Sequence, residues 1–435
     1  MRANWGWVGR GLTAVSILLM AAACGPAVTP TPTASPLPSP TPSPPALTPT
    51  ADASDPLVVT LTLWVPEVFS PYQEDPAGVL LAQRLNSFSG TYPNLQVETI
   101  VKKAHGRGGL LDFMRTAQAA APSVLPDLVI LDASELVLAT QAELLRPLDG
   151  LLPEERAADQ FPFAAQLGDV DGQTMGVVVA AELEHVVYDP ALFSRPPLTW
   201  TDVISAPAPF AFPAAGRDGG VNDATLIQYL TADGHVVDGE GNPALEEGPL
   251  RQVLTFYDQA VASGVISPTV VLALDDVEAA WELYQEGQTG MAVVNSRSFQ
   301  LRPEETLAAA GPIPTRNGDV VTFAEGWAMV MVTSDPQRQQ QAAILLDWLV
   351  APSFLGPWAR AEGYLPGTLS GLQAWTATEE ERAMLEALLE GARPPVAPAL
   401  RAAIGPSLQT AVEMVLRGRR TPANAAAEAS RAVGP

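Results

Sequence analysis

The chain is poor in the residues that build disulfides and zinc sites, because its 435 residues include one cysteine, Cys24, and three histidines, His105, His185 and His235. A single thiol excludes an intrachain disulfide, and so few ligands exclude a Cys/His zinc cluster within one chain. Calcium bound by carboxylates stays open. Positive charge is also scarce, since 24 Lys and Arg face 48 Asp and Glu for a net charge of −24. Such a chain repels phosphate backbones, so we expect no nucleic-acid partner.

The composition otherwise indicates a folded protein of two or three domains. Hydrophobic residues make up 47% and charged residues 17%, which excludes disorder of the whole chain. There are 42 prolines, too many to be spread evenly through packed elements, so we expect them to be concentrated in a linker.

The N-terminus has the order of charges and apolar residues typical of a secretory signal. Arg2 and Arg10 precede an apolar run over 12–20, and three alanines over 21–23 come directly before Cys24. This arrangement resembles a bacterial lipobox, although Ala21 stands where that pattern favours leucine. The resemblance implies a signal peptide over 1–23 and a lipid-modified Cys24. The alternative is an ordinary signal peptide with a chance cysteine.

Residues 24–56 form the expected tether. Eleven prolines lie between residues 25 and 56, alternating with Thr, Ser and Ala. Proline favours the extended polyproline II conformation at about 3.1 Å per residue, so the segment predicts a semi-stiff spacer on the order of 100 Å long.

The chain from residue 57 onward alternates strand and helix patterns. Strands over 57–65, 95–101 and 127–132 are separated by helices over 78–88 and 110–120, which predicts a βαβαβ unit with parallel strands. Open sheets of this kind bind ligands beyond the carboxyl ends of their strands. The side chains at those ends, and therefore candidates for ligand contact, are Trp64, Glu67, Asp132 and Ser134.

Later segments continue the alternation. Strand patterns occur at 176–181, 185–188, 291–295 and 326–332, and helix patterns at 250–263, 275–284 and 336–350.

Eight short motifs in order resemble the bacterial extracellular solute-binding proteins of carbohydrate ABC importers, the group that includes maltose-binding proteins. Each motif is weak alone, but their order and spacing together cover nearly all of residues 57–420. They are Pro126–Asp132, Glu143–Asp149, Gly176–Glu182, Val187–Asp189, Pro197–Trp200, Glu286–Met291, Glu325–Trp327 and Gly363–Pro366.

The resemblance implies an α/β, two-lobed periplasmic-binding-protein-like (type II) fold with a ligand cleft between the lobes. Lobe one would comprise 57–181 plus 303–349, and lobe two 182–302 plus 350–435. Neither a cofactor nor a catalytic residue is implied.

A saccharide site needs polar groups for hydroxyls and aromatic faces for the apolar side of the ring. Glu182 matches a hinge-side glutamate of the family, with Glu184 as the alternative contact. Further candidates implied by the motifs are Asn295, Arg297, Glu325, Trp327, Trp358 and Tyr364. Two strand-end candidates also have a structural explanation, because Trp64 would pack equally well inside lobe one and Asp132 would cap the following helix.

The function implied is that of an exported lipoprotein on the outer face of the cell membrane. It would capture a small solute, preferably a sugar or oligosaccharide, and deliver it as a monomer to ABC importer permease subunits. Other solutes stay open (a polyol, a glycerol phosphodiester, a peptide or a polyamine), and so does a role as a surface sensor. An enzyme is disfavoured, since the sequence has no Gly-x-Ser-x-Gly, His-Glu-x-x-His or Walker motif.

Overall fold

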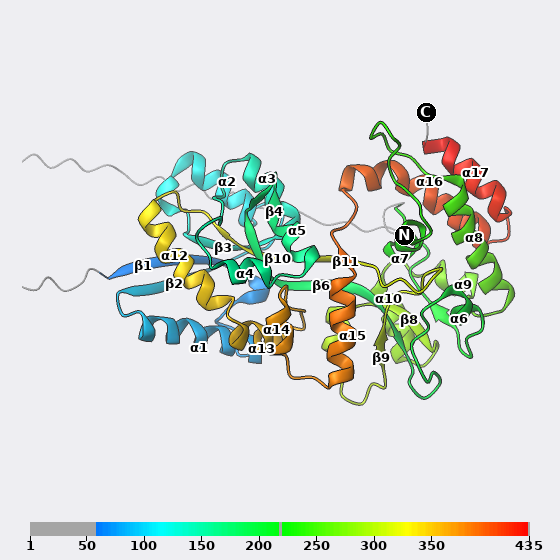
Figure 1. The fold of residues 1–435 in the computed structure, drawn as a ribbon, viewed down its shortest axis with the longest axis horizontal. Coiled ribbons are helices and arrows are strands. Elements are labelled where there is room, and N and C mark those ends of the chain that lie inside the picture. Colours follow the sequence, from blue (N-terminus) through cyan, green and yellow to red (C-terminus); the bar gives the residue numbers. More distant parts are fainter. Residues whose placement is uncertain (1–57, 217–219, 434–435) are drawn as a thin grey trace, which may run out of the picture. The chain divides into compact units, whose positions relative to one another are not determined.

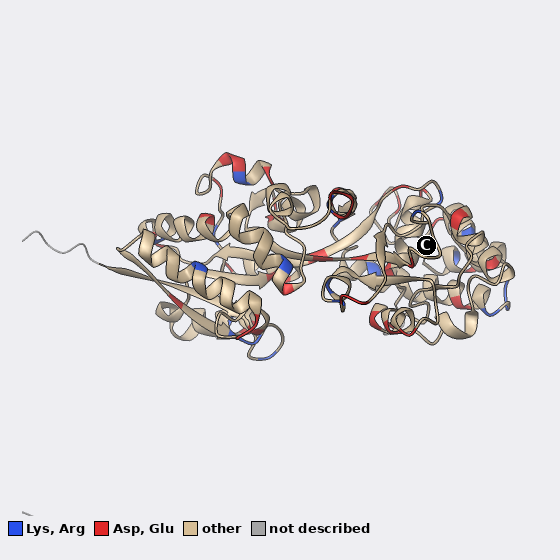
Figure 2. Ribbon diagram, turned by 90° about the horizontal axis from the view of Figure 1, so that it is seen from below, with Lys and Arg blue, Asp and Glu red and all other residues tan. Residues whose placement is uncertain are grey.

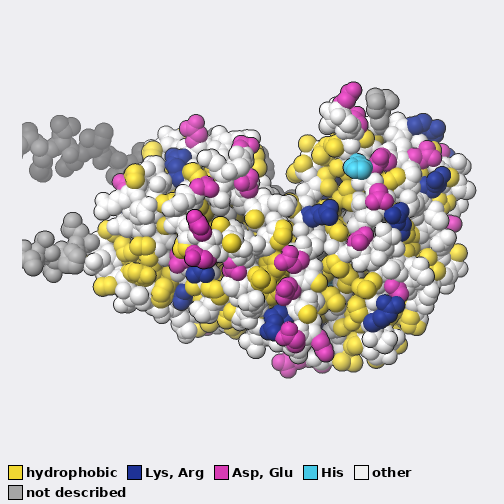
Figure 3. All heavy atoms as spheres, viewed as in Figure 1, with side chains coloured by type: hydrophobic (Ala, Val, Ile, Leu, Met, Phe, Trp, Pro, Cys, Tyr) yellow, Lys and Arg dark blue, Asp and Glu magenta, His cyan; other side chains and the backbone are white. Residues whose placement is uncertain are grey.

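A computed structural model describes residues 58–216 and 220–433 (Figure 1). The expected signal peptide, Cys24 and the proline-rich tether lie outside the described residues. Acidic side chains occur over much of the face shown in Figure 3, as the net charge requires.

The predicted βαβαβ unit is present. Strands β1 (Val59–Pro66), β2 (Leu95–Lys102) and β3 (Leu128–Asp132) are parallel, with β1 in the middle. Helices α1 (Pro76–Thr91) and α2 (Leu110–Ala120) connect them. Helix α1 begins where the Asp75 carboxylate accepts a 2.7 Å hydrogen bond from the Gly78 amide, so a side-chain cap and a following proline fix its start.

Two long strands continue this sheet into the second half of the chain. Strand β10 (Thr322–Met331) lies antiparallel to β3 and to β6 (Gly176–Tyr188). Strand β6 is one 13-residue strand where the sequence indicated two. Its first part pairs with β10 and its last part with β8 (Met291–Asn295). The order in the described sheet is β2-β1-β3-β10-β6-β8-β7, where β7 is Phe210–Ala211.

Separate hydrophobic cores lie at the two ends of these long strands, and they define two α/β lobes. In lobe one, α1, α12 (Pro336–Leu349) and α13 (Pro352–Glu362) cover one face of the sheet. Helices α2, α3 (Leu136–Gln141) and α5 (Pro162–Gly168) cover the other face (Figure 1). Helices α14 (Leu369–Gln373) and α15 (Glu379–Glu390) add side chains to the same core.

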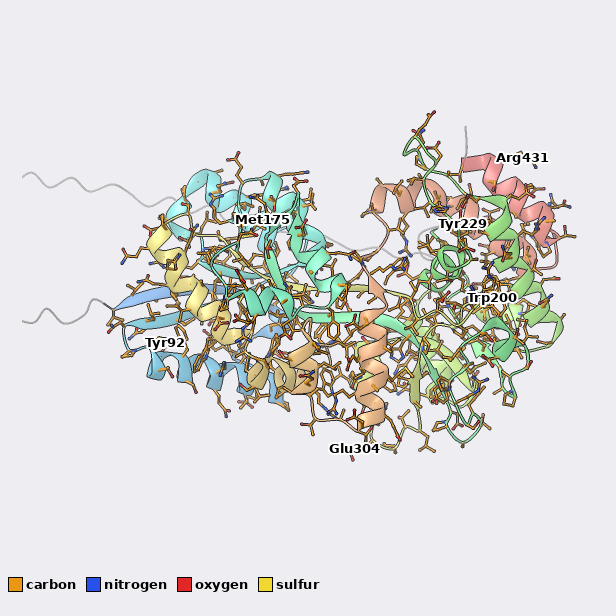
Figure 4. The ribbon with its side chains drawn as sticks, viewed as in Figure 1. Tyr92, Met175, Trp200, Tyr229, Glu304 and Arg431 are labelled. Carbon is orange, nitrogen blue, oxygen red and sulfur yellow. The ribbon has the colours of Figure 1, made fainter. Side chains whose placement is uncertain are left out.

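Lobe two has a large core between its strands and a layer of helices. The contributing helices are α6 (Trp200–Ile204), α7 (Asp223–Thr231), α8 (Glu247–Ala262), α9 (Pro268–Val271), α16 (Pro398–Leu416) and α17 (Pro422–Val433). Figure 4 labels Trp200 on α6 and Tyr229 on α7 within this core. The Tyr229 hydroxyl donates to the His235 carbonyl at 2.7 Å and accepts from the Glu246 amide at 2.8 Å, which satisfies a polar group in an apolar setting.

A smaller core of lobe two lies on the opposite face of β6 and β8. It is formed by α10 (Val277–Gln285) and by Phe299 of α11 (Ser296–Gln300). His185 is fully buried there, with its ring 5.0 Å from that of Phe299, and burial lowers the pKa of His185 to about 4.

The packing of two segments differs from the lobe boundaries expected from sequence. Helices α13 to α15 contribute to the lobe-one cores, although residues from 350 onward were assigned to lobe two. Strand β9 (Ala309–Gly311) pairs with the lobe-two end of β6, on the edge opposite β8, although 303–349 was assigned to lobe one. Short apolar helices fit either core by composition, so only their contacts distinguish the two assignments. We propose lobe boundaries that follow these contacts.

The remaining described elements are short. They are α4 (Glu154–Ala158), β4 (Asp169–Val170), β5 (Gln173–Thr174), β11 (Ala392–Arg393) and the 3₁₀ turns η1 (Glu67–Phe69), η2 (Pro122–Val124) and η3 (Ala133–Glu135). Within the described residues, no single helix has the length and hydropathy of a membrane span. Only α12 and α13 taken together, bent by 65°, meet both criteria.

Candidate ligand-binding site

Four polar side chains share one face of the sheet where β6 and β10 pass from lobe to lobe and β8 begins to pair with β6. In the antiparallel ladder Glu325 of β10 lies opposite Glu182 of β6, and Glu184 lies opposite Asn295 of β8. Directly opposed residues point to the same side of a sheet, as do residues two apart along one strand. Acidic residues on these strands are red in Figure 2.

An open cavity of about 460 Å³ lies beside these strands. Its walls come from β6, β8 and β10 and from the N-terminal ends of three helices, α7, α10 and α16. The polar residues that line it are Glu184, Asn222, Asp223, Asp275, Asp276, Glu278, Asn295, Glu325 and Arg401.

Glu184 is the most deeply placed carboxyl group of this cavity. Burial raises its pKa well above the usual value, and the neighbouring charge of Asp223 raises it further, while Arg401 acts in the opposite direction. Arg401 forms an ion pair with Asp223, and its guanidinium also donates to the Val221 carbonyl at 2.8 Å. Arg401 thus holds the first turn of α7 in place against the N-terminal end of α16.

Glu325 lies at the rim of the same cavity, with its side chain exposed. The protein around it removes part of its hydration and thereby raises its pKa, as do the charges of Asp223, Asp132 and Glu182. These carboxyl groups form a connected acidic set.

Glu182 is half-buried on the lobe-one side of this set. Burial raises its pKa, whereas a hydrogen bond from the Asn295 side chain and the charge of Arg297 lower it. Arg297 donates through Nε to the Glu362 carbonyl at 3.2 Å, and its guanidinium lies 4.9 Å from the centre of the Tyr364 ring. Asn295 also caps α11 by accepting from the Arg297 amide at 2.7 Å.

Three of the aromatic candidates cluster next to Glu182. The rings of Trp327, Trp358 and Tyr364 all lie within 5.5 Å of the Phe69 ring, centre to centre. Trp358 is 2% exposed and belongs to the lobe-one core. Trp327 and Tyr364 are 8% and 6% exposed, so each has only an edge available for a ligand.

The strand-end candidates of lobe one lie in different surroundings. Trp64 is 1% exposed and packs against Phe113 at 5.4 Å, as the packing alternative predicts. Glu67 is exposed on η1. Asp132 caps η3 by accepting from the Ser134 amide at 2.8 Å, as the capping alternative predicts, and Ser134 is exposed.

The free oxygen of Asp132 still faces polar neighbours. The His105 ring lies 3.6 Å from this carboxylate and 3.8 Å from that of Glu135, and its centre is 5.3 Å from that of the Trp327 ring. Asp132 is also directly opposite Trp327 in the β3–β10 ladder. This group therefore extends the polar face of Glu182 and Glu325 toward lobe one.

The sequence analysis missed six polar residues of the cavity: Asn222, Asp223, Asp275, Asp276, Glu278 and Arg401. They lie at helix N-termini, not at strand ends, and Arg401 is far along the chain from the others. The available signal was Asn222-Asp223 and Asp275-Asp276 directly before helical patterns, which indicates caps but not a cavity. Among the described residues, no group of three or more His, Cys, Asp and Glu has an arrangement suited to a metal ion.

Comparison with known families gives a match over residues 108–383 to the family model described as bacterial extracellular solute-binding protein. Binding proteins of Brucella abortus and Brucella suis are 22% identical over 262 residues, which are 55% of this chain. The match spans 62% of the length of these relatives.

Solved structures agree with the two-lobed fold. The cyclic α-maltosyl-1,6-maltose binding protein of Arthrobacter globiformis has a TM-score of 0.65 at 19% identity, covering 86% of this chain and 98% of that protein. The sugar-binding protein MalE of Xanthomonas citri has a TM-score of 0.63 at 20% identity, covering 86% and 96%. A solute-binding protein of Agrobacterium radiobacter K84 in complex with ribitol has a TM-score of 0.54 at 21% identity, covering 87% and 99%. The family and these neighbours are described as binding proteins and not as enzymes.

Proposed function

Because the chain belongs to the bacterial extracellular solute-binding proteins, we propose that it captures a saccharide between its lobes and delivers it to an ABC importer. The observation that carries the proposal is the polar face shared by Glu182, Glu184, Glu325 and Asn295, which lie on β6 and β10, the strands that connect the lobes, and on β8 of lobe two. A ligand on this face touches both lobes at once, so it stabilises the arrangement in which they come together.

The chemistry of the face suits sugar hydroxyls. Carboxylates accept hydrogen bonds, and the guanidinium groups of Arg297 and Arg401 donate them. The exposed edges of Trp327 and Tyr364 offer limited apolar contact, so the polar groups supply most of the recognition. The names of the structural neighbours include maltose derivatives and ribitol, which supports a polyhydroxylated ligand.

The saccharide proposal is tested by thermal unfolding of the domain from residue 58 onward in a panel of mono-, di- and oligosaccharides. A ligand at one hundred times its Kd adds about 2.7 kcal/mol to the free energy of unfolding and raises Tm accordingly. Glu325→Gln should weaken the response, because the amide replaces one acceptor with a donor. Glu304→Gln, at an exposed position labelled in Figure 4, is the matched control. If no saccharide of the panel changes Tm, the proposal that the ligand is a saccharide is contradicted.

The lipid anchor is a separate part of the proposal, supported by the Ala-Ala-Ala-Cys sequence that ends at Cys24. Cys24→Ala should move the protein from the membrane fraction to the soluble extracytoplasmic fraction, because only the thiol accepts a diacylglycerol. Cell fractionation and immunoblotting measure this. An unchanged membrane fraction would show that something other than Cys24 retains the protein.

Delivery to an importer is tested by detergent extraction of the tagged full-length lipoprotein. Co-purification of two permease subunits supports transport, whereas a membrane partner of another kind supports the sensor alternative.

A further inference from the structure

The cavity between α7, α10 and the crossing strands carries more negative charge than a neutral sugar requires. Six carboxyl groups line it, those of Glu184, Asp223, Asp275, Asp276, Glu278 and Glu325, against one guanidinium among its described lining residues. Resting on the proposed function, we infer that the captured saccharide carries a free ammonium group that binds in this cavity.

Two of the six carboxylates are explained by the fold itself. Asp276 caps α10 by accepting from the backbone of Ala279, and Asp223 forms an ion pair with Arg401. These interactions would be needed whatever the ligand is. They account for the only positive side chain in the described lining of the cavity.

The other four carboxylates have no ion-pair partner among the described residues. Glu278 accepts a 3.0 Å hydrogen bond from the Ser298 hydroxyl, which leaves its charge uncompensated. Glu184 has one carboxylate oxygen, Oε2, that is buried without a hydrogen-bond partner. Sugar hydroxyls solvate such oxygens, whereas a bound cation also offsets the mutual repulsion of several carboxylates.

An independent observation points to a ligand that also accepts hydrogen bonds. Asn222 is 6% exposed and lines the cavity. Its Oδ1 caps α7 by accepting from the Thr225 amide at 2.8 Å, so the amide orientation is fixed by the cap. Its Nδ2 is then a buried donor without a partner. A buried donor left unsatisfied is costly, so a ligand oxygen at this point is favoured.

These two requirements together select the ligand class. A simple polyamine has ammonium groups but no oxygen for Asn222, and a neutral sugar has oxygens but no charge for the carboxylates. An amino saccharide has both, with hydroxyls on the same ring as the ammonium group.

Calorimetry with matched probes tests this inference on the domain from residue 58 onward. The chitosan disaccharide, which has two free amines, is compared with N,N′-diacetylchitobiose and with putrescine. The aminated disaccharide should bind about tenfold or more tighter than its acetylated form, because a charge-assisted hydrogen bond is stronger than a neutral one.

Each other outcome overturns the inference. Equal or tighter binding of the acetylated disaccharide would contradict the requirement for an ammonium group but would leave the proposal of saccharide capture intact. If putrescine binds as tightly as the aminated disaccharide, the sugar hydroxyls do not contribute to recognition and the ligand is not an amino saccharide. If no probe binds and the neutral panel also fails, both the inference and the proposed function are wrong.

Variants separate the charge from the fold. The double variant Asp275→Asn and Glu278→Gln changes two exposed rim positions and should abolish most of the preference for the aminated disaccharide. Asn222→Ser keeps a capping oxygen for α7 but removes the Nδ2 donor, so it should weaken the aminated and acetylated forms equally. Asp258→Asn, at an exposed position of α8, is the charge-matched control and should change neither affinity.

Proton release provides a readout that a structural effect would not produce. The pKa values of Glu184, Glu325 and Asp223 are raised, with burial as the first cause of each, so these carboxyl groups keep their protons to higher pH than exposed carboxyl groups do. The other charged groups that line the cavity are Asp275, Asp276, Glu278 and Arg401. An ammonium group bound among them favours the ionised carboxylates and therefore displaces protons from the set. Binding enthalpies in two buffers of different ionisation enthalpy should therefore show proton release for the aminated disaccharide. No release, or proton uptake, contradicts the inference.

Discussion

Burial strongly alters the pKa of Glu362, a carboxyl group beside the candidate site. It lies near the end of α13, is 8% exposed, and burial together with the charge of Asp75 raises its pKa from 4.5 to about 7. Arg297 lowers this pKa in part, and Arg297 itself touches the candidate site through Tyr364.

Replacing this carboxyl group should change how stability depends on pH. Between about pH 4.5 and 7 the folded protein retains the Glu362 proton while the unfolded chain releases it, so rising pH lowers the free energy of unfolding across this window. Because Glu362→Gln has no proton to lose, its free energy of unfolding should fall by up to about 3 kcal/mol less than that of wild type as the pH rises through this window.

Chemical denaturation of wild type and variant at pH 5 and pH 8 measures the effect. Glu386→Gln, at a partly exposed position of α15, serves as the control for loss of one charge. Parallel pH profiles for wild type and Glu362→Gln would contradict the raised pKa.

At the scale of elements, the end of α13 shows how a single backbone conformation positions the site. Gly363 ends the helix in the left-handed conformation, with φ of +79°, and turns the chain so that Tyr364 faces Phe69 and Leu365 exchanges backbone hydrogen bonds of 2.7 and 2.8 Å with Ala181. A residue with a side chain is disfavoured here by conformation and by space, because a Cβ atom would lie 2.6 Å from Leu301 Cγ.

Gly363→Ala should therefore destabilise the protein more than an equivalent change elsewhere. Gly418, after α16, also has a positive φ, of +65°, but its Cβ would meet nothing within 4 Å. Gly418→Ala should cost about 1 kcal/mol of conformational strain. Gly363→Ala should cost about 1–3 kcal/mol more because Leu301 must move.

Urea denaturation measures both variants against wild type. Equal losses of stability in the two variants would show that Leu301 accommodates the new methyl group. Saccharide affinity should fall only in Gly363→Ala, because only that turn places Tyr364.

At the scale of the whole molecule, the strands β6 and β10 connect two lobes with separate cores. Under the proposed function, a ligand held by Glu182 and Glu325 from one side and by Asp223 and Asn222 from the other would bring the lobes together. We therefore expect a bound saccharide to decrease the radius of gyration of the domain from residue 58 onward in X-ray scattering.

The matched comparison is the same domain with Glu184→Gln and Glu325→Gln at the same saccharide concentration. The variant should retain the radius of gyration of the unliganded domain. A wild-type radius that stays constant at saturating ligand would place the ligand on one lobe only.

The sequence by itself determined the alternation of elements, because apolar periodicity reports which faces of a segment are buried. Helix α2 occurs at the predicted residues, and β1, β2, β3 and α1 differ from prediction by a few residues at their ends. The order of motifs also indicated the family, which the family model confirms. Local signals of this kind need only neighbouring residues.

Only the tertiary structure decided which polar side chains meet. Glu182, Glu184, Asn295 and Glu325 were candidates because they lie in or next to motifs that resemble those of the family, and the ladder places all four on one face of the strands. Asn222, Asp223 and Arg401 were missed because they converge from helices separated by up to 180 residues. Their burial and their proximity to one another depend on how the helices pack around shared strands. No local sequence pattern encodes contacts between residues so far apart along the chain.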